Sequence, residues 1–195
     1  MKEGKIDLHA LAVLGLAGSG KSSVVARIRR NAGVSSYTFS GGRSLRKLSD
    51  AGDTVAGSLV STGAAMPGEL FVNLLMRELH ALPQTPTHLL LDGNPRSLEQ
   101  VQAIPALEFR SFHCIVLSVP IDVAVSRVRA RAHYSSRVDD ARGLASYRVR
   151  QDATLQPRIV REVGTFSDVK FIDGDRDLDA VTADALAYFD SILKK

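Results

Sequence analysis

Residues 15–22 read Gly15-Leu16-Ala17-Gly18-Ser19-Gly20-Lys21-Ser22, and they lie between an apolar run and a helical pattern. This stretch matches the spacing G-x-x-x-x-G-K-[ST], and a position between a strand and a helix is the context in which that spacing binds phosphate. Glycines let the backbone curl so that its N–H groups converge at a helix N-terminus, whose partial positive charge favours an anion. We therefore predict a nucleoside triphosphate site.

The chain around this stretch alternates between short apolar runs and helical patterns. The apolar runs predict buried parallel strands at residues 8–14, 37–39, 89–91, 114–119 and 169–172. Helices are predicted at 22–30, 69–82, 98–104, 121–131, 139–163 with a break at Pro157, and 178–193. Strands that alternate with helices predict an α/β fold of three layers, α/β/α, around a central five-stranded parallel sheet. Residues 50–68 and 133–137 are polar or rich in small residues, and we expect them to be mobile.

Composition sets broad limits on this chain of 195 residues. Its 45% of hydrophobic and 24% of charged residues are typical of a soluble protein, and the apolar run near the start is far shorter than the about 20 residues of a membrane span. From this short run we expect a protein that contacts no membrane. The single cysteine, Cys114, cannot form an internal disulfide, so we expect a cytoplasmic protein. Nine arginines occur between residues 127 and 161, which indicates an anionic partner. Since no aromatic residues are interleaved as in a nucleic-acid stacking surface, that partner is predicted to be a small phosphorylated molecule.

A second pattern, LLLDGNPRSLEQ at residues 89–100, places Asp92 at the end of a buried strand. A Gly-x-Pro turn follows, and then Arg96 opens a helix. Ligands of α/β proteins gather at the carboxyl ends of parallel strands. This pattern, with Gln100 in the helix, resembles that of the adenylate kinases, which read DGFPRT and then Gln.

The resemblance to adenylate kinases covers nearly the whole chain. Residues 40–46, SGGRSLR, are similar to the family's S-T-G-D-x-L-R, and residues 66–69, MPGE, to its V-P-D-E. Further matches are Arg127, Arg131, the element Arg137-Val138-Asp139-Asp140 with Arg148 eleven residues later, and the turn Asp173-Gly174-Asp175. The resemblance implies a single nucleoside monophosphate kinase domain over residues 1–195, with a helical acceptor-binding insertion at about 40–70 and a short lid at about 131–138. No cysteine cluster lies in that lid, so no structural zinc is expected. Separately, we expect a monomer.

Motif and resemblance together assign roles to individual residues. ATP is expected to bind to Gly15, Gly18, Ser19, Gly20, Lys21, Ser22, Ser23, Arg127, Arg131 and Asp175. The acceptor is expected at Ser40, Gly41, Arg46, Gly93, Arg96 and Gln100. Mg²⁺ that accompanies ATP is expected at Ser22 and, through water, at Asp92, because hard cations prefer oxygen ligands. Because phosphoryl transfer depends on positioning and on cations, the expected catalytic residues are Lys21, Arg96, Arg131, Arg137 and Arg148.

The chain departs from the adenylate kinase pattern around the acceptor. Gly41 replaces a Thr, Arg43 and Gly68 replace Asp residues, and Asn94 replaces a Phe. Gln100 favours AMP, since an amide can both accept from and donate to adenine; CMP, UMP and dTMP remain alternatives. Two other functions also remain open: a P-loop kinase for another small hydroxylated acceptor, and a nucleotide-binding regulator with little turnover.

Overall fold

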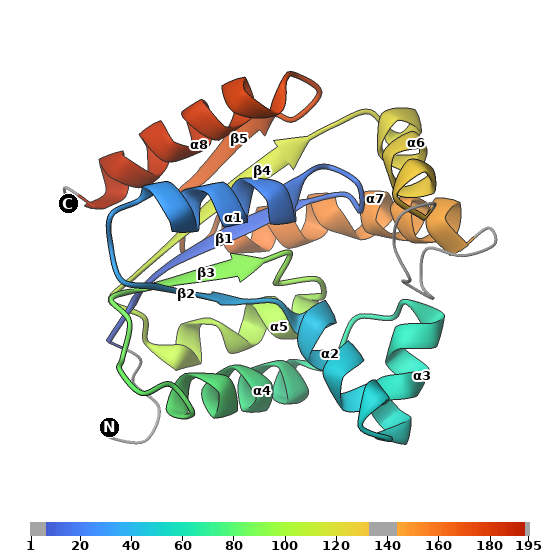
Figure 1. Cartoon of the computed structure of the whole chain (residues 1–195), viewed down its shortest axis with the longest axis horizontal. Helices are drawn as coiled ribbons and strands as arrows, with labels where there is room; N and C mark the ends of the chain where they lie inside the picture. The colour runs from blue at the N-terminus through green and yellow to red at the C-terminus, as the bar shows by residue number, and fades with distance from the viewer. Residues whose placement is uncertain (1–6, 133–143, 194–195) are drawn as a thin grey trace.

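The computed structural model describes residues 7–132 and 144–193, and these form a layered α/β structure (Figure 1). Its centre is a five-stranded sheet in the order β2-β3-β1-β4-β5, in which every pairing is parallel. The strands are β1 (His9–Gly15), β2 (Ser36–Phe39), β3 (His88–Asp92), β4 (Ser111–Ser118) and β5 (Val169–Asp173). The predicted five-stranded parallel sheet is confirmed.

Alternation along β1 assigns its side chains to the two faces of the sheet. Leu11 and Val13 belong to the cluster formed with α1 (Lys21–Asn31) and α8 (Leu178–Leu193), where Phe189 is buried. Ala10, Ala12 and Leu14 belong to the larger cluster, which is covered by α4 (Gly68–His80), α5 (Leu98–Ala103) and α7 (Leu144–Val163). In Figure 1, α8 lies above the sheet and α1 is drawn across its middle, whereas α4 and α5 lie below it. The predicted three layers are therefore present.

The register of the central strands brings the two sequence patterns together. Val13 of β1 lies opposite Asp92 of β3 on one side and Ile115 of β4 on the other. Because all three strands run in the same direction, the loop after β1 and the turn after β3 leave the sheet at the same edge. A third small cluster at that edge joins Leu16 and Ala17 to α6 (Ile121–Ala132) and α7.

Helices occupy part of a segment that the sequence predicted to be mobile. α2 (Gly41–Asp50) and α3 (Thr54–Thr62) pack against each other, and α3 lies inside residues 50–68. The Asp53 carboxylate accepts a hydrogen bond of 2.9 Å from Ala56 N and caps α3. The helical insertion that the resemblance implied is therefore present. The helical pattern in the sequence did not mark α3, because Gly, Ser and Thr have low helix propensity, for which capping and packing compensate. Mobility of this segment stays a prediction. The second segment predicted to be mobile, 133–137, lies outside the described residues.

The predicted break at Pro157 is absent, since α7 continues through this residue to Val163. Proline removes one backbone hydrogen bond of a helix. Ile159 and Val163, which follow it, are buried against the sheet and hold the last turns in place. Within residues 7–132 and 144–193, no helix combines the length and the apolar character that a membrane span requires.

Candidate active site

The loop from Gly15 to Gly20 has the backbone geometry of a phosphate cradle. Gly15, Gly18 and Gly20 have φ values of 147°, 87° and 94°, and the loop leads directly into α1. At Gly18 a Cβ atom would lie only 2.4 Å from the carbonyl oxygen of Ala124 on α6. Both the left-handed backbone and the close approach to α6 therefore require glycine at this position.

Lys21, the first residue of α1, has its ammonium group folded back onto the loop. Its Nζ donates hydrogen bonds of 2.8 Å to Gly15 O and 2.7 Å to Leu16 O. Although the residue as a whole is only half-buried, burial of its ammonium group lowers the pKa of Lys21 to about 8. The carboxylates of Asp152 and Asp92 act in the opposite direction and favour the charged form.

Ser22 and Asp92 place a hydroxyl and a carboxylate next to each other beside the cradle. Ser22 Oγ donates a hydrogen bond of 3.1 Å to Asp92 Oδ1, and Asp92 is 8% exposed at the end of β3. A hydroxyl and a carboxylate fit Mg²⁺, which prefers oxygen and is usually completed by waters and substrate phosphates. Over the described part of the chain, no cluster of three or more His, Cys, Asp and Glu side chains forms a separate metal site.

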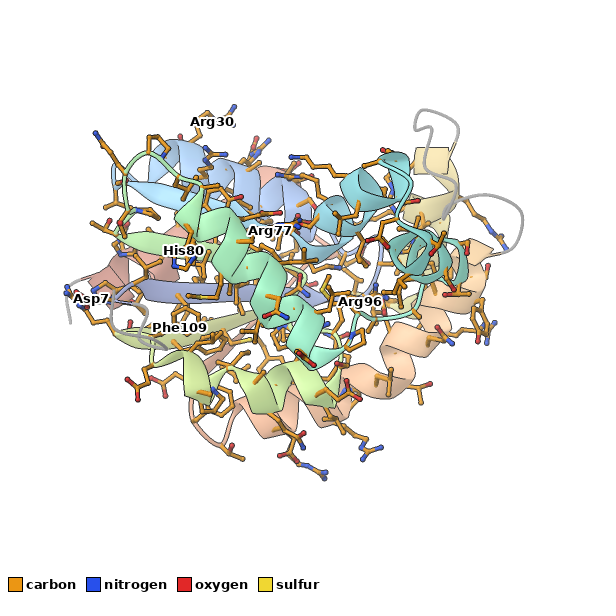
Figure 2. The ribbon with its side chains drawn as sticks, turned by 90° about the horizontal axis from the view of Figure 1, so that it is seen from below. Asp7, Arg30, Arg77, His80, Arg96 and Phe109 are labelled. Atoms are coloured by element: carbon orange, nitrogen blue, oxygen red, sulfur yellow. The ribbon has the colours of Figure 1, made fainter. Side chains whose placement is uncertain are left out.

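Cationic side chains from distant segments line one cleft of about 340 Å³ at this edge of the sheet. The cleft contains Ala17, Gly18, Gly20, Lys21, Ser22, Ser23, Ser40, Gly42, Arg43, Arg46, Asp92, Gly93, Asn94, Arg96, Arg127, Arg131, Arg148 and Asp152. The structure thus brings together residues that were predicted from four separate patterns. In Figure 2, Arg96 lies near the N-terminal end of α4, whereas Asp7 and Phe109 lie toward the other end of the sheet. Arg137 lies outside the described residues.

Arg127 has partners at the edge of the cleft. It donates from Nη1 to Gly174 O at 2.9 Å and from Nη2 to Asp175 Oδ1 at 3.2 Å. These bonds connect α6 with the turn after β5. The predicted grouping of Arg127 with Asp175 is therefore seen in the structure, and their contact with ATP stays a prediction. Ser19, also predicted at the ATP site, is buried in the loop and is 2% exposed.

Gln100 makes internal contacts that its sequence position did not indicate. Its side chain is 1% exposed. Gln100 Oε1 accepts hydrogen bonds from Arg96 N at 2.8 Å and from Asn94 Nδ2 at 3.0 Å, and Nε2 donates to Met66 O at 2.8 Å. The amide thus connects the turn after β3 to the segment before α4, and Gln100 is not among the residues that line the cleft. Its predicted contact with the acceptor stays a prediction.

Two of the departures from the adenylate kinase pattern contact each other. Gly41 N donates a hydrogen bond of 3.0 Å to Asn94 Oδ1, and Asn94 is 3% exposed. A Cβ atom at position 41 would lie 2.9 Å from Asn94 Oδ1 and 2.5 Å from Met66 Cε. Gly41 is therefore the residue type that admits the Asn94 amide. A third departure, Gly68, is close-packed too, since a Cβ there would lie 2.8 Å from Glu99 O.

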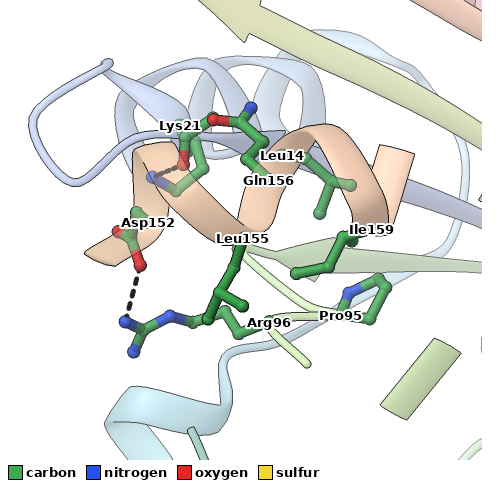
Figure 3. A pocket seen from close by; sticks show the side chains of 10 residues that line it. Leu14, Lys21, Pro95, Arg96, Asp152, Leu155, Gln156 and Ile159 are labelled. Carbon is green, nitrogen blue, oxygen red and sulfur yellow. Dashed lines mark hydrogen bonds and ion pairs between the residues drawn. The ribbon is translucent and has the colours of Figure 1, made fainter. Parts of the chain in front are cut away.

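Asp152 is a site residue that the sequence reasoning missed. Its Oδ2 accepts a hydrogen bond from Ala17 N at 3.1 Å. Its Oδ1 accepts one from Arg96 Nη2 at 2.9 Å, which Figure 3 shows. One signal could have found it: Asp152 follows Arg148 by four residues, and such pairs share a face of a helix. An acidic residue on the same helix face as a predicted site arginine indicates a site residue more strongly than an acidic residue on a face that is exposed to solvent.

A parallel sheet with a phosphate cradle and an arginine-lined cleft at its carboxyl edge defines a class, the P-loop phosphotransferases. The sequence model of a family described as an AAA domain matches residues 14–143, about two thirds of the chain. The chain belongs to this family of P-loop proteins.

Individual relatives are more specific than the family. The chain is 29% identical to an adenylate kinase of Helicobacter pylori (strain ATCC 700392 / 26695) over 187 residues, which are 90% of this chain and 94% of that protein. It is 36% identical to a chloroplastic adenylate kinase of Zea mays over 76 residues, which are 39% of this chain and about a third (34%) of that protein. The predicted relationship to adenylate kinases and the predicted class of enzyme, a nucleoside monophosphate kinase, are confirmed.

Proposed function

We propose that this enzyme transfers the γ-phosphoryl group of ATP to AMP and forms two ADP. The observation that carries the proposal is the single cleft in which Lys21 of the phosphate cradle lies with Arg46, Arg96, Arg127, Arg131 and Arg148. An enzyme that joins two phosphate-bearing substrates needs both sets of cations around one position. The similarity to adenylate kinases over 90% of the chain supports the same reaction.

In this reaction an oxygen of the acceptor phosphate forms a bond to the γ-phosphorus while the bond from that phosphorus to the β,γ-bridging oxygen breaks. Both electrons of the broken bond stay on this oxygen, which becomes part of the β-phosphate of the departing ADP. The acceptor phosphate is largely ionised near neutral pH, so no protein base is required. The work of the chain is to align the two substrates and to stabilise charge on the equatorial oxygens.

The arginines of the cleft are suited to different parts of this task. Arg46 and Arg96 are proposed to bind the acceptor phosphate, because a planar guanidinium can donate to two oxygens at once. Arg131, Arg148 and Lys21 are proposed to contact the transferring group. Arg127 is proposed to lie against the ATP base, on the helix face that it shares with Arg131.

Ser22 and Asp92 are proposed to hold the Mg²⁺ that accompanies ATP, Ser22 directly and Asp92 through water. The cation would neutralise phosphate charge and fix the geometry of the phosphate chain. Asp92→Asn keeps the shape of the side chain and should raise the Mg²⁺ concentration needed for half-maximal rate. Activation by Mg²⁺ that is the same in this variant and in the wild type would contradict the assignment.

AMP is proposed as the acceptor because Gln100 occupies the position of the family's glutamine and holds the backbone of Arg96, which lines the cleft. Other bases need to be tested too, because Gly41 and Asn94, which contact each other, replace the Thr and Phe of the adenylate kinase pattern beside the proposed acceptor site. CMP, UMP and dTMP are therefore the alternative acceptors. A regulator that binds ATP without turnover is the alternative outside this reaction.

The test is an acceptor panel. Purified protein with ATP and Mg²⁺ is incubated with AMP, CMP, UMP, GMP or dTMP, and diphosphates are separated by anion-exchange chromatography. We expect ADP from AMP. The rate of ADP formation should decrease by about 10²- to 10³-fold or more in Lys21→Met, because this variant lacks a cation at the transferring group. A preference for another base would replace AMP in the proposal. ATP binding without any diphosphate product would overturn it.

A further inference from the structure

We propose that Asp152 is a positioning residue. In the free enzyme its carboxylate occupies an anion site between the phosphate cradle and Arg96, and the phosphates of a nucleotide displace this carboxylate when they bind. The residue touches one group from each half of the site. Ala17 N belongs to the loop that binds ATP, and Arg96 belongs to the turn after β3 that is assigned to the acceptor. One carboxylate on α7 therefore joins two segments that are 79 residues apart in sequence.

The surroundings of Asp152 are those of a bound phosphate. Its two oxygens accept from a backbone N–H and from a guanidinium, which are the groups that hold phosphates at helix N-termini and arginine sites. Its charge also favours the protonated form of Lys21, the cation of the cradle. With a side chain only 18% exposed, the carboxylate lies inside the cleft.

A carboxylate at this position opposes the arrival of ATP. At separations of a few ångströms, like charges in a partly buried site repel strongly. Nucleotide phosphates at the cradle must therefore displace Asp152 from Ala17 or bind against its charge. A cavity of about 40 Å³ beside the carboxylate has Lys21 and Arg96 at its polar part and Leu14, Pro95, Leu155 and Ile159 around it (Figure 3). This space allows the side chain to change position while it stays near Lys21.

Displacement of Asp152 also changes the acceptor half of the site. Arg96 loses its carboxylate partner and can donate that hydrogen bond to the acceptor phosphate instead. ATP binding should therefore increase acceptor affinity, and acceptor binding should increase ATP affinity by the same factor. This coupling rests on the proposed function, whereas competition between Asp152 and phosphates at the cradle does not.

The first experiment measures binding at the cradle alone. Tripolyphosphate and ATP are titrated by calorimetry, with Mg²⁺ and without an acceptor, into wild-type protein, Asp152→Asn and Asp152→Glu. The pH is about 6, well below the Lys21 pKa of about 8, so that Lys21 stays protonated when the Asp152 charge is removed. Asp152→Asn removes the charge and keeps the shape, so it should bind both ligands about tenfold more tightly. Asp152→Glu keeps the charge and should stay within about threefold of the wild type. Equal or weaker binding by Asp152→Asn would overturn the proposal.

Glu162→Gln is the matched control. It removes one negative charge from the same helix, ten residues or about 15 Å farther along α7, where Glu162 is exposed and paired with Arg161. This variant should bind tripolyphosphate like the wild type. A gain equal to that of Asp152→Asn would mean that net charge alone is responsible, and it would overturn the role of Asp152.

The second experiment measures the coupling. The affinity for AMP is determined with and without a non-hydrolysable ATP analogue. In the wild type the analogue should increase AMP affinity several-fold, and in Asp152→Asn this factor should fall toward one. The same factor in both proteins would overturn the coupling. If AMP neither binds nor is phosphorylated, the proposed function fails, and the tripolyphosphate titration still decides the role of Asp152.

Discussion

The charge of Lys21 depends on the position of this residue in the fold. Burial lowers its pKa to about 8, so in the free enzyme its positive charge is lost as the pH rises through that value. Lys21 is proposed to use this charge to bind phosphates. We therefore expect the affinity for ATP to decrease as the pH rises through about 8, measured by calorimetry in the wild type. An affinity that is constant across this range would contradict the low pKa.

The same group also predicts a dependence of stability on pH. Between pH about 8 and 10.5, the unfolded chain keeps the Lys21 proton and the native state releases it. Since stability rises with pH wherever the unfolded state binds more protons, the contribution of Lys21 to the free energy of unfolding should rise across this interval. The difference between wild type and Lys21→Met in urea unfolding isolates this contribution. A difference that is the same at pH about 8 and above pH about 10 would contradict the prediction.

At the scale of elements, the site depends on how α2 meets the turn after β3. Gly41→Ala adds a Cβ that would lie 2.5 Å from Met66 Cε and 2.9 Å from Asn94 Oδ1. Overpacking of this kind costs about 1–3 kcal/mol of stability. The change should also raise KM for the acceptor and leave KM for ATP unchanged, because the contact lies in the half of the site that is proposed to bind the acceptor. Thermal unfolding and steady-state kinetics measure the two effects.

Gly57→Ala in α3 is the matched control for that variant. A Cβ at position 57 meets its nearest atom, Ser49 Oγ, at 3.5 Å, an ordinary contact distance. Since alanine favours helices over glycine, this variant should gain about 0.5–1 kcal/mol. The same substitution should therefore have opposite signs at the two positions. A Gly41→Ala protein as stable as Gly57→Ala would show that α2 can move away from Asn94 at no cost.

At the scale of the whole molecule, the sequence predicted what depends on local patterns. Continuous apolar runs marked all five strands, and glycine spacing marked the cradle. The helical pattern did not mark α3, because Gly57 and its serine and threonine neighbours have low helix propensity, and only the resemblance implied helices there. Packing on α2 and the Asp53 cap favour this helix. Asp152 was missed because its partner Ala17 is 135 residues away in the sequence. The internal contacts of Gln100 likewise depend on tertiary structure.

α7 connects the parts of the molecule and leads to a prediction about its unfolding. Its Ile159 and Val163 are in the core below the sheet, and Val149 is in the cluster with Leu16 and Ala17 of the cradle. Because one helix contributes to both clusters, we expect a single cooperative unfolding transition for the chain, with equal calorimetric and van't Hoff enthalpies. ATP at about 100 times its Kd should stabilise the whole unit by about 2.7 kcal/mol and move that one transition upward. Separate melting of the α2 and α3 region, unaffected by ATP, would instead show that the acceptor region is an independent unit and that the prediction of a single domain is wrong.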